Sequence, residues 1–288
     1  MSRYSVMNVG GPADYLVTAG SSQDLEAYIS FLWEEKIPFL LLGGGSNTLI
    51  SDAGIRELVL INEAKEIKFL DRADDHILLW SESGASFGNL ARRAGSKGWS
   101  GLEWASGIPG TVGGAVVNNA GAFGSNVAEI LEMADILHPS EDIIQRTEWS
   151  VDDFEYDYRS SVIKSGAKQA VVLSASFKME KSTPVNVKRK ISAIAEKRQS
   201  SQPSGASLGS MFKNPPGDFA GRLIEESGLK GTRVGDVEIS SLHGNFFLNK
   251  GKATATEIAS MIAQVRDQVY EKFGVELELE IQFIGDWN

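Results

Sequence analysis

The sequence predicts an α+β fold with more than one domain. Of its 288 residues, 42% are hydrophobic, which is enough to bury a substantial core, and the length suits two or three closely packed domains. Segments with the 3.6-residue spacing of helices alternate with the apolar runs of buried strands. A stretch of small residues at 200–207 marks the last domain boundary, and a further α+β unit follows it.

The first half of the chain contains helix and strand signals in alternation. Serine is a preferred N-cap residue, and apolar residues spaced three and four apart then mark a buried helical face. The elements expected here are a helix capped by Ser21 or Ser22, strands at 39–42 and 77–80, a helix at 87–96, a strand near 130–136 and a hairpin turn at 139–142.

The second half continues the same alternation up to the C-terminus. Thr183-Pro184 is typical of a helix start, because proline is favoured in the first turn. The elements expected here are a strand at 171–177, a helix from 183, a helix capped by Asp218 and ending near Gly228, strands within 232–240 and 245–249, a helix starting at Thr256 and a closing strand at 275–284.

Composition and charge exclude several classes of protein. No run approaches the ~20 apolar residues that a membrane-spanning helix needs, and the first residues lack the apolar core of a signal peptide, so we expect a cytoplasmic protein without membrane insertion. The absence of cysteine rules out disulfides, thiolate metal ligands and thiol nucleophiles. A net charge of −10 disfavours nucleic acid as a partner, because such binding depends on neutralising phosphates.

Two glycine-rich segments are candidates for phosphate binding, because glycine lets backbone N–H groups approach an anion closely. They are 43–47, with the sequence GGGSN, and 107–114, with the sequence GIPGTVGG. The first lacks the Lys-Ser/Thr ending of a P-loop, and the second does not fit the G-x-G-x-x-G spacing of a dinucleotide fold. Each segment alone is equally well explained as a tight turn, but two of them in one acidic chain favour a ligand with a diphosphate.

These segments belong to an ordered set of motifs through which the chain resembles the UDP-N-acetylenolpyruvoylglucosamine reductase family, and the resemblance covers nearly the whole sequence. No tyrosine-bearing loop is inserted after residue 161, which resembles the shorter of the two family subtypes. The motifs are Gly10-Gly11-Pro12-Ala13, 43–47, 107–115, Asn119-Ala120-Gly121-Ala122-Phe123-Gly124, Tyr158-Arg159-Ser160-Ser161, Gly209-Ser210-Met211-Phe212-Lys213-Asn214-Pro215, Ala220-Gly221-Arg222-Leu223-Ile224, His243-Gly244-Asn245-Phe246 and Glu280-Ile281-Gln282-Phe283-Ile284-Gly285.

The resemblance implies a two-part FAD-binding module of the vanillyl-alcohol-oxidase superfamily plus an α+β substrate-binding domain. The expected division is 1–62 joined by 281–288, then 63–199, then 200–280. NADPH would reduce a noncovalently bound FAD, and the flavin N5 would pass hydride to the enolpyruvyl group of a UDP-sugar substrate; the oligomeric state stays open. The residues implied to bind FAD are Gly43, Gly44, Gly45, Ser46, Asn47, Gly107, Ile108, Pro109, Gly110, Thr111, Gly113, Gly114, Asn119 and Gly121.

Hydride addition to one alkene carbon builds negative charge on its neighbour and on the attached carboxylate, so the reaction needs a cation and a proton source. By the resemblance, Arg159 would bind the carboxylate and stabilise the enolate, and Tyr158 would contact the substrate. Without the family context, Arg159 is better explained as a surface arginine that pairs with a neighbouring acidic residue at 153, 155 or 157.

Two further catalytic residues follow from the same resemblance. Ser210 would give the proton to the carbon, with Lys213 and Asn214 supporting it or binding the substrate diphosphate. Without the resemblance, the residues around Ser210 favour an ordinary loop serine. Period-two alternation places Glu276, Glu278, Glu280 and Gln282 on one strand face and cannot choose among them. The resemblance selects Glu280, as a protonated or hydrogen-bonded group that stabilises the enolate.

No metal site is expected, because the three histidines His76, His138 and His243 are scattered without ligand spacing. His243 instead fits a structural role beside Asn245. Two other functions stay open: an FAD-dependent oxidase of the same superfamily, which would react rapidly with oxygen, and a noncatalytic relative that binds a flavin or a nucleotide-sugar. The joint presence of Arg159, Ser210 and Glu280 favours the reductase over both.

Overall fold

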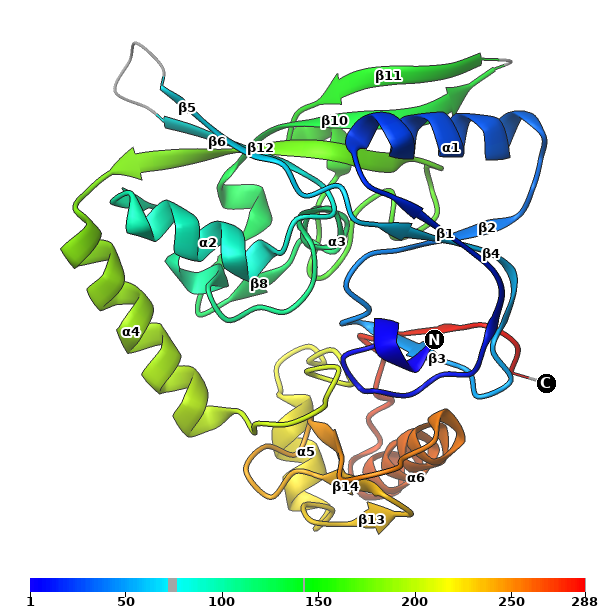
Figure 1. The fold of residues 1–288 in the computed structure, drawn as a ribbon. Coiled ribbons are helices and arrows are strands. Elements are labelled where there is room, and N and C mark those ends of the chain that lie inside the picture. Colours follow the sequence, from blue (N-terminus) through cyan, green and yellow to red (C-terminus); the bar gives the residue numbers. More distant parts are fainter. Residues whose placement is uncertain (72–76, 142, 288) are drawn as a thin grey trace. The chain divides into compact units, whose positions relative to one another are not determined.

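A computed structural model describes residues 1–71, 77–141 and 143–287 (Figure 1). Its contacts divide the chain into two compact units. Unit 1 comprises Met1–Tyr15, Gly45–Leu58 and Arg198–Asn288, and unit 2 comprises Leu16–Gly44 and Val59–Lys197. Each unit encloses its own cluster of buried hydrophobic side chains. The three-domain division expected from the sequence stays a prediction.

Unit 2 is built on a six-stranded antiparallel sheet. The strand β12 is the centre of this sheet, since its 11 residues pair with three other strands and seven consecutive ones are buried. The strand order is β11 (Ile143–Trp149), β10 (Leu131–Ser140), β12 (Val171–Lys181), β6 (Ile77–Glu82) and β5 (Ile67–Asp71), with β7 (Trp99–Ser100) paired to the end of β12.

Two helices cover one face of this sheet, α2 (Phe87–Ser96) and α3 (Val112–Val117) (Figure 1). Ser86 and Thr111 cap them, each accepting a hydrogen bond from the backbone N–H three residues on. Phe87 is fully buried and lies in edge contact with Trp104, with a ring-centroid distance of 5.7 Å. This face therefore contains the apolar core of unit 2.

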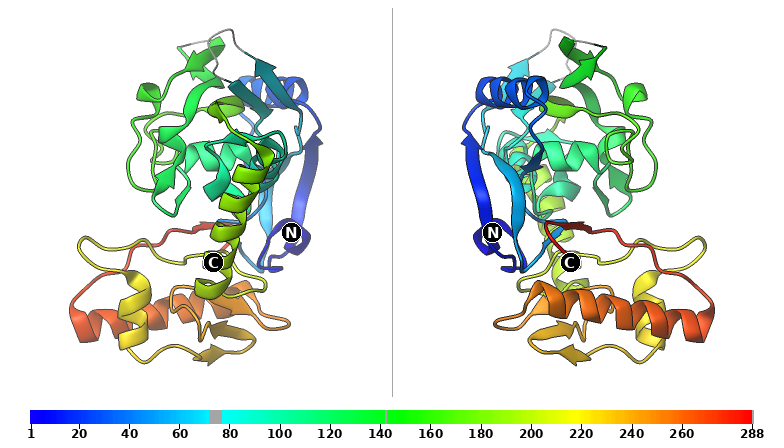
Figure 2. Two further views of the ribbon diagram at one scale, coloured as in Figure 1. Left: turned by 90° about the vertical axis from the view of Figure 1, so that its left-hand side faces the viewer. Right: turned by 90° about the vertical axis from the view of Figure 1, so that its right-hand side faces the viewer.

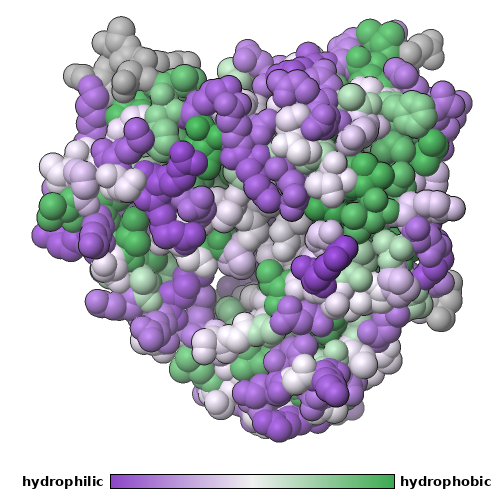
Figure 3. Space-filling view, viewed as in Figure 1, coloured by the Kyte–Doolittle hydropathy of each residue, from purple (hydrophilic) through white to green (hydrophobic). Residues whose placement is uncertain are grey.

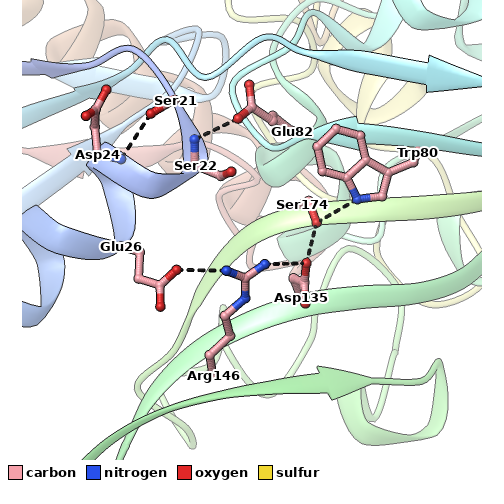
Figure 4. Close-up of polar contacts among 9 residues, drawn as sticks. All are labelled: Ser21, Ser22, Asp24, Glu26, Trp80, Glu82, Asp135, Arg146 and Ser174. Carbon is pink, nitrogen blue, oxygen red and sulfur yellow. Dashed lines mark hydrogen bonds and ion pairs between the residues drawn. The ribbon is translucent and has the colours of Figure 1, made fainter.

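The helix α1 (Ser22–Glu34) lies on the opposite face, where a polar network joins it to the sheet (Figure 4). Arg146 of β11 bridges Glu26 of α1 at 2.8 Å and Asp135 of β10 at 3.0 Å. Ser174 of β12 donates to the same Asp135 at 2.9 Å and accepts from Trp80 Nε1 at 3.1 Å. Adjacent residues of a strand face opposite sides, so this network and the apolar core occupy different faces of one sheet.

Three further strands form a small sheet in the order β1 (Ala13–Ala19), β4 (Ile55–Asn62) and β2 (Phe39–Leu42). The chain passes between the two units within β1 and β4.

Hydrophobic side chains are exposed on and near α1, including Tyr28 at 40% and Phe31 at 56%, and Figure 3 shows hydrophobic surface in this region.

In unit 1, the long helix α6 packs against a three-stranded sheet, and α5 packs against α6 (Figure 2). Its core includes the fully buried Met7, Leu49, Phe212, Phe247 and Val265 from distant segments of the chain. The elements are β3 (Thr48–Ile50) paired in parallel with β16 (Gln282–Ile284), the sheet β13 (Arg233–Val234), β14 (Val237–Ile239) and β15 (Phe247–Asn249), and the helices α5 (Ala220–Glu226) and α6 (Ala255–Phe273).

The remaining elements are short, apart from α4, which contains the boundary between the two units at residues 197 and 198. They are the 3₁₀-helices η1 (Ser2–Tyr4), η2 (Glu103–Ala105), η3 (Val127–Glu129) and η4 (Asp152–Phe154), the hairpin of β8 (Gly121–Ala122) and β9 (Ser125–Asn126), and α4 (Pro184–Ser201).

Most predicted elements are confirmed, including the Ser21 cap, the helix at 87–96 and the strands at 39–42 and 171–177. Three helix ends differ. The helix after 183 continues to Ser201, into the segment of small residues that was predicted to mark the last domain boundary. Thr254 rather than Thr256 caps α6, because Thr254 and Glu257 form a reciprocal capping box. Position 142 of the predicted hairpin turn lies outside the described residues.

The start of α5 is one residue later than predicted. Asp218 accepts from the N–H of Phe219 and pairs with Arg222, and Phe219 occupies the N-cap position. The first helical N–H, that of Ala220, donates to the Asn214 side chain at 3.1 Å. An amide from the preceding loop therefore contributes to the capping of the helix.

The predicted closing strand at 275–284 is wrong over most of its length, because only Gln282–Ile284 form a strand. The chain leaves α6 through Gly274 in the left-handed region, at φ 67°. The backbone of 278–280 then bonds to the 211–213 segment rather than to a sheet. The alternation of exposure persists even so, since Glu276, Glu278 and Gln282 are exposed whereas Leu277 and Ile281 are buried.

Candidate active site

The two glycine segments meet in unit 2. A Cβ on Gly43 would lie 2.5 Å from Thr111 Oγ1, and a Cβ on Gly44 would lie 3.0 Å from Gly110 Cα. Both distances are shorter than ordinary contacts of a Cβ, so the two segments approach each other closely and glycine at 43 and 44 suits this approach. Sequence reasoning predicted both segments, and the tertiary structure brings them together.

The second segment runs directly into α3. The N–H of Gly113 donates to Ser83 O at 2.7 Å, and Thr111 Oγ1 accepts from the N–H of Gly114 at 3.3 Å. Gly44, Gly107 and Gly114 are exposed. Adjacent backbones that reach the surface without side chains suit a bulky diphosphate ligand, so this region fits the dinucleotide that the sequence predicts.

The first segment continues into unit 1, where Asn47 connects it to the C-terminal segment. Asn47 Nδ2 donates to Glu280 O at 3.1 Å, and Asn47 O accepts from the N–H of Gln282 at 2.9 Å. Gly45 has φ 56°, and a Cβ there would collide with Tyr4 O. A predicted cofactor residue therefore holds the backbone of a predicted catalytic residue.

Arg159 lies in unit 2, in a loop attached to the residues that follow α3. Its Nη2 donates to Gly121 O at 2.8 Å, and Asn119 Nδ2 donates to Asp157 O at 3.3 Å. Ser161 Oγ donates to Val117 O at 2.7 Å. Asn119 and Gly121, both predicted to bind cofactor, thus also support the loop that contains Arg159.

Two tyrosines flank this loop differently. Tyr158 is 50% exposed, and its ring centroid lies 5.6 Å from the Arg159 guanidinium carbon. Tyr156 stacks on Phe154 and donates to Val116 O at 2.8 Å, and burial raises its pKa, so it stays a neutral phenol. Tyr158 is therefore available to a ligand, whereas Tyr156 fixes the loop.

Ser210 and Glu280 lie on adjacent backbone segments of unit 1. The N–H of Glu280 donates to Met211 O at 2.9 Å, and Phe212 pairs with Leu279 in antiparallel register. This register places Glu280 opposite Met211, one residue from Ser210. Arg159 belongs to the other unit, and the meeting of all three side chains stays a prediction.

Lys213 and Asn214 have clear partners in the structure. Lys213 forms an ion pair with Glu278. Asn214 Oδ1 accepts the first N–H of α5. Both contacts fix the course of the loop after Ser210, and their predicted contacts with substrate stay predictions.

Asn245 is the main residue of this region that sequence reasoning did not select. It is 3% exposed, and its side-chain amide bonds to the backbone of Phe212 beside Ser210. The predicted structural contact of His243 with it is present, since His243 Nδ1 accepts from the N–H of Asn245 at 3.2 Å. The only sequence signal was its place in the motif 243–246.

The part of the chain that the structure describes has neither a metal-binding group nor a membrane-spanning helix. Within that part, histidine and acidic side chains form no group that could hold a metal ion. None of its helices is both long and apolar enough to span a bilayer. His76 lies outside the described residues.

Two family models match the chain. One is the FAD binding domain, over residues 13–145, and the other is the C-terminal domain of UDP-N-acetylenolpyruvoylglucosamine reductase, over residues 200–284. The first covers the strands and loops around both glycine segments. The second covers the Ser210 and Glu280 segments.

Relatives of known name match over the full length. The UDP-N-acetylenolpyruvoylglucosamine reductase of Chloroflexus aurantiacus is 39% identical, covering 99% of this chain and 95% of the relative. That of Rubrobacter xylanophilus is 40% identical, with 99% and 94% covered. The crystal structure of the enzyme from Thermus caldophilus has a TM-score of 0.80 at 33% identity, covering 98% of this chain and 96% of that one.

These matches confirm the resemblance inferred from the motifs and the predicted α+β fold. They also establish the expected chemistry at the level of the family, an FAD-dependent oxidoreductase that takes electrons from NADPH. The chain belongs to the UDP-N-acetylenolpyruvoylglucosamine reductase family, the flavoproteins that act in peptidoglycan synthesis.

Proposed function

We propose that this protein reduces the enolpyruvyl group of UDP-N-acetylglucosamine enolpyruvate to give UDP-N-acetylmuramate, with Ser210 as proton donor. The observation that carries the residue assignment is the backbone pairing of 210–212 with 279–280. It keeps the backbone segments that contain Ser210 and Glu280 adjacent to each other. The hydroxyl and the carboxyl of these two residues are the groups that protonation of a carbanion-like carbon next to a carboxylate requires.

Bound FAD, once reduced by NADPH, supplies the hydride. We assign its diphosphate to the meeting glycine segments, through Gly43, Gly44 and the residues from Gly110 to Gly114. The support for this assignment is the close approach of Gly43 to the Thr111 side chain and of Gly44 to the Gly110 backbone. Asn47, the last residue of the first glycine segment, donates a hydrogen bond to the backbone of Glu280 within unit 1.

Arg159 binds the substrate carboxylate in this proposal. Its backbone has φ 55°, a conformation that is uncommon for residues other than glycine, and its loop is held by Asn119 and Ser161. A guanidinium fixed in this way pairs with a carboxylate through two hydrogen bonds and stabilises the charge that develops on it. Tyr158, half exposed beside it, contacts the substrate.

The test is an anaerobic stopped-flow experiment that separates the two half-reactions. NADPH is added first and bleaches the flavin absorbance, and the enolpyruvyl substrate then restores it. Ser210→Ala should be reduced at the wild-type rate and reoxidised at least ~100-fold more slowly, because general acid catalysis contributes on that order. Ser227→Ala, which removes a hydroxyl bound within α5, is the matched control.

Arg159→Lys and Glu280→Gln should also spare flavin reduction and slow reoxidation, since neither residue is assigned to NADPH. Normal reoxidation of Ser210→Ala would refute the proton-donor role. A flavin that regains its absorbance with oxygen but not with the enolpyruvyl substrate would support the oxidase alternative.

A further inference from the structure

Asn245 makes three hydrogen bonds to the segment that carries Ser210. Its Oδ1 accepts from the N–H of Phe212 at 3.0 Å, and its Nδ2 donates to Phe212 O at 2.8 Å. Its own backbone carbonyl accepts from the N–H of Met211 at 2.9 Å. With 3% of Asn245 exposed, these bonds are shielded from water and are correspondingly strong.

The segment 210–212 has little regular structure of its own. It is joined to its neighbours by single bridges, Ser210 to Phe246 and Phe212 to Leu279, and belongs to none of the strands assigned in the described chain. The preceding Gly209 has φ 80°, and a Cβ there would meet no described atom within 4 Å. The space around Gly209 is thus open, and the Asn245 amide acts as a substitute for a strand partner just after Ser210.

We propose that Asn245 is a positioning residue for the proton transfer, acting by fixing the backbone that sets the direction of Ser210 Oγ. This inference rests on the proposed function of Ser210. The hydroxyl must point at one carbon of the substrate, and displacement by about 1 Å can cost on the order of 100-fold in rate. Asn245 does not touch the reacting atoms; it acts through the Phe212 peptide.

The variant that tests this is Asn245→Asp. It keeps the size of the side chain and an acceptor for the Phe212 N–H, but it replaces the donor by an oxygen that faces Phe212 O. The 210–212 segment must then shift, while the Ser210 hydroxyl itself is retained. We expect reoxidation by the enolpyruvyl substrate to slow by ~10- to 100-fold, with flavin reduction by NADPH unchanged.

The matched control is Asn249→Asp. Asn249 also donates to a backbone carbonyl, that of Met7 at 2.9 Å, and accepts from the N–H groups of Gly251 and Ala253. It therefore loses the same type of hydrogen bond in the same unit without contacting Phe212 through its side chain. Both variants should lose similar stability, and only Asn245→Asp should slow reoxidation and increase its solvent deuterium isotope effect.

A double-mutant cycle with Ser210→Ala identifies the route of the effect. If Asn245 acts through Ser210, adding Asn245→Asp to Ser210→Ala should slow reoxidation no further. Additive losses, or equal losses in Asn245→Asp and Asn249→Asp, would overturn the proposal. If Asn245→Asp does not fold, Asn245→Ser, which keeps a shorter donor and acceptor, is taken through the same cycle with the same criteria.

The cycle also distinguishes this inference from the function on which it rests. Normal reoxidation of Ser210→Ala alone would remove the proton-donor role and the positioning proposal together. Slow reoxidation of Ser210→Ala combined with wild-type behaviour of Asn245→Asp would leave the proposed function intact and overturn only the role of Asn245.

Discussion

Asp52 shows how much one side chain contributes to the internal order of unit 1. Its two carboxylate oxygens accept from the N–H groups of Ala255 and Thr256, both at 2.8 Å, and from Thr256 Oγ1 at 2.8 Å. With Thr254 accepting from the N–H of Glu257, the first three amides of α6 are satisfied. The loop after β3 is thereby attached to a helix about two hundred residues further along the chain.

Asp52→Asn should lower the free energy of unfolding by about 1 kcal/mol at pH 7, the usual value of a capping interaction. Burial alone would raise the pKa of Asp52, but the hydrogen bonds from Ala255 and Thr256 outweigh it and hold the pKa below 3.8. The stabilisation is therefore present above pH 3.8 and is lost as the pH falls through the lower folded-state pKa.

Urea unfolding at several pH values checks this prediction. The difference between wild type and Asp52→Asn should shrink on the acid side. Asp14→Asn, which removes the partner of Arg56 in an exposed ion pair, serves as the control and should change stability little. A loss as large in Asp14→Asn as in Asp52→Asn would contradict the capping explanation.

At the scale of elements, α4 is attached to unit 2 by apolar contacts of the buried Val187 and the partly buried Ile194, and by polar contacts of Lys190. Lys190 of α4 reaches Glu103 of η2 at 3.3 Å and Ser100 Oγ at 2.9 Å. Glu103 is 7% exposed and also accepts from Ser100 Oγ at 2.6 Å and from the N–H of Gly101 at 2.7 Å. A buried carboxylate with several donors is costly to leave partly unpaired.

Glu103→Gln should therefore destabilise the protein by ~1–3 kcal/mol, and Lys190→Met by less, because the Lys190 side chain is 56% exposed. Burial opposes ionisation of Glu103, but the bonds from Ser100 and Gly101 outweigh it and lower its pKa from 4.5. This stabilisation is present above pH 4.5 and is lost as the pH falls further.

Chemical denaturation of each variant across the acid range measures both effects. Lys188→Met, an exposed position of the same helix, should match wild type. If Lys188→Met and Glu103→Gln lost equal stability, the buried cluster would not be the attachment that we describe.

At the scale of the whole molecule, the two glycine segments link cofactor binding to stability. A ligand that binds only the folded state raises its stability in proportion to the logarithm of ligand concentration over its dissociation constant. Gly43→Ala places a methyl group 2.5 Å from Thr111 Oγ1, the hydroxyl that caps α3. The Thr111 side chain or the two segments must then shift, which weakens the binding of a ligand that contacts both segments.

We expect Gly43→Ala to raise the dissociation constant of FAD by about 5- to 150-fold, because strain of 1–3 kcal/mol from an inserted methyl group corresponds to that range. Titration of the apoprotein, followed by flavin fluorescence, measures the affinity directly. The shift of the unfolding midpoint on adding FAD gives a second readout. Gly20→Ala is the control, since its Cβ would lie at an ordinary 3.6 Å from Asp24 Oδ2.

The sequence by itself determined most of the secondary structure and the family. Ser21 and the helix at 87–96 were readable because capping and helical periodicity are local properties of the chain. The ordered glycine and Ser210 motifs identified the family, as the full-length matches confirm. Residue roles within those motifs came from the resemblance and stay proposals.

Only the tertiary structure decided how distant segments support one another. The segment 275–284 alternates like a strand, yet its backbone pairs with two separate neighbours, 278–280 with the loop after Ser210 and 282–284 with β3, because backbone groups bond to whichever partners the packed chain brings near. The hydrogen bond of Asn245 to Phe212 and the close approach of Gly43 to Thr111 also join residues that are far apart in the sequence. Such contacts depend on the approach of residues far apart in sequence, and local periodicity contains no information about that approach.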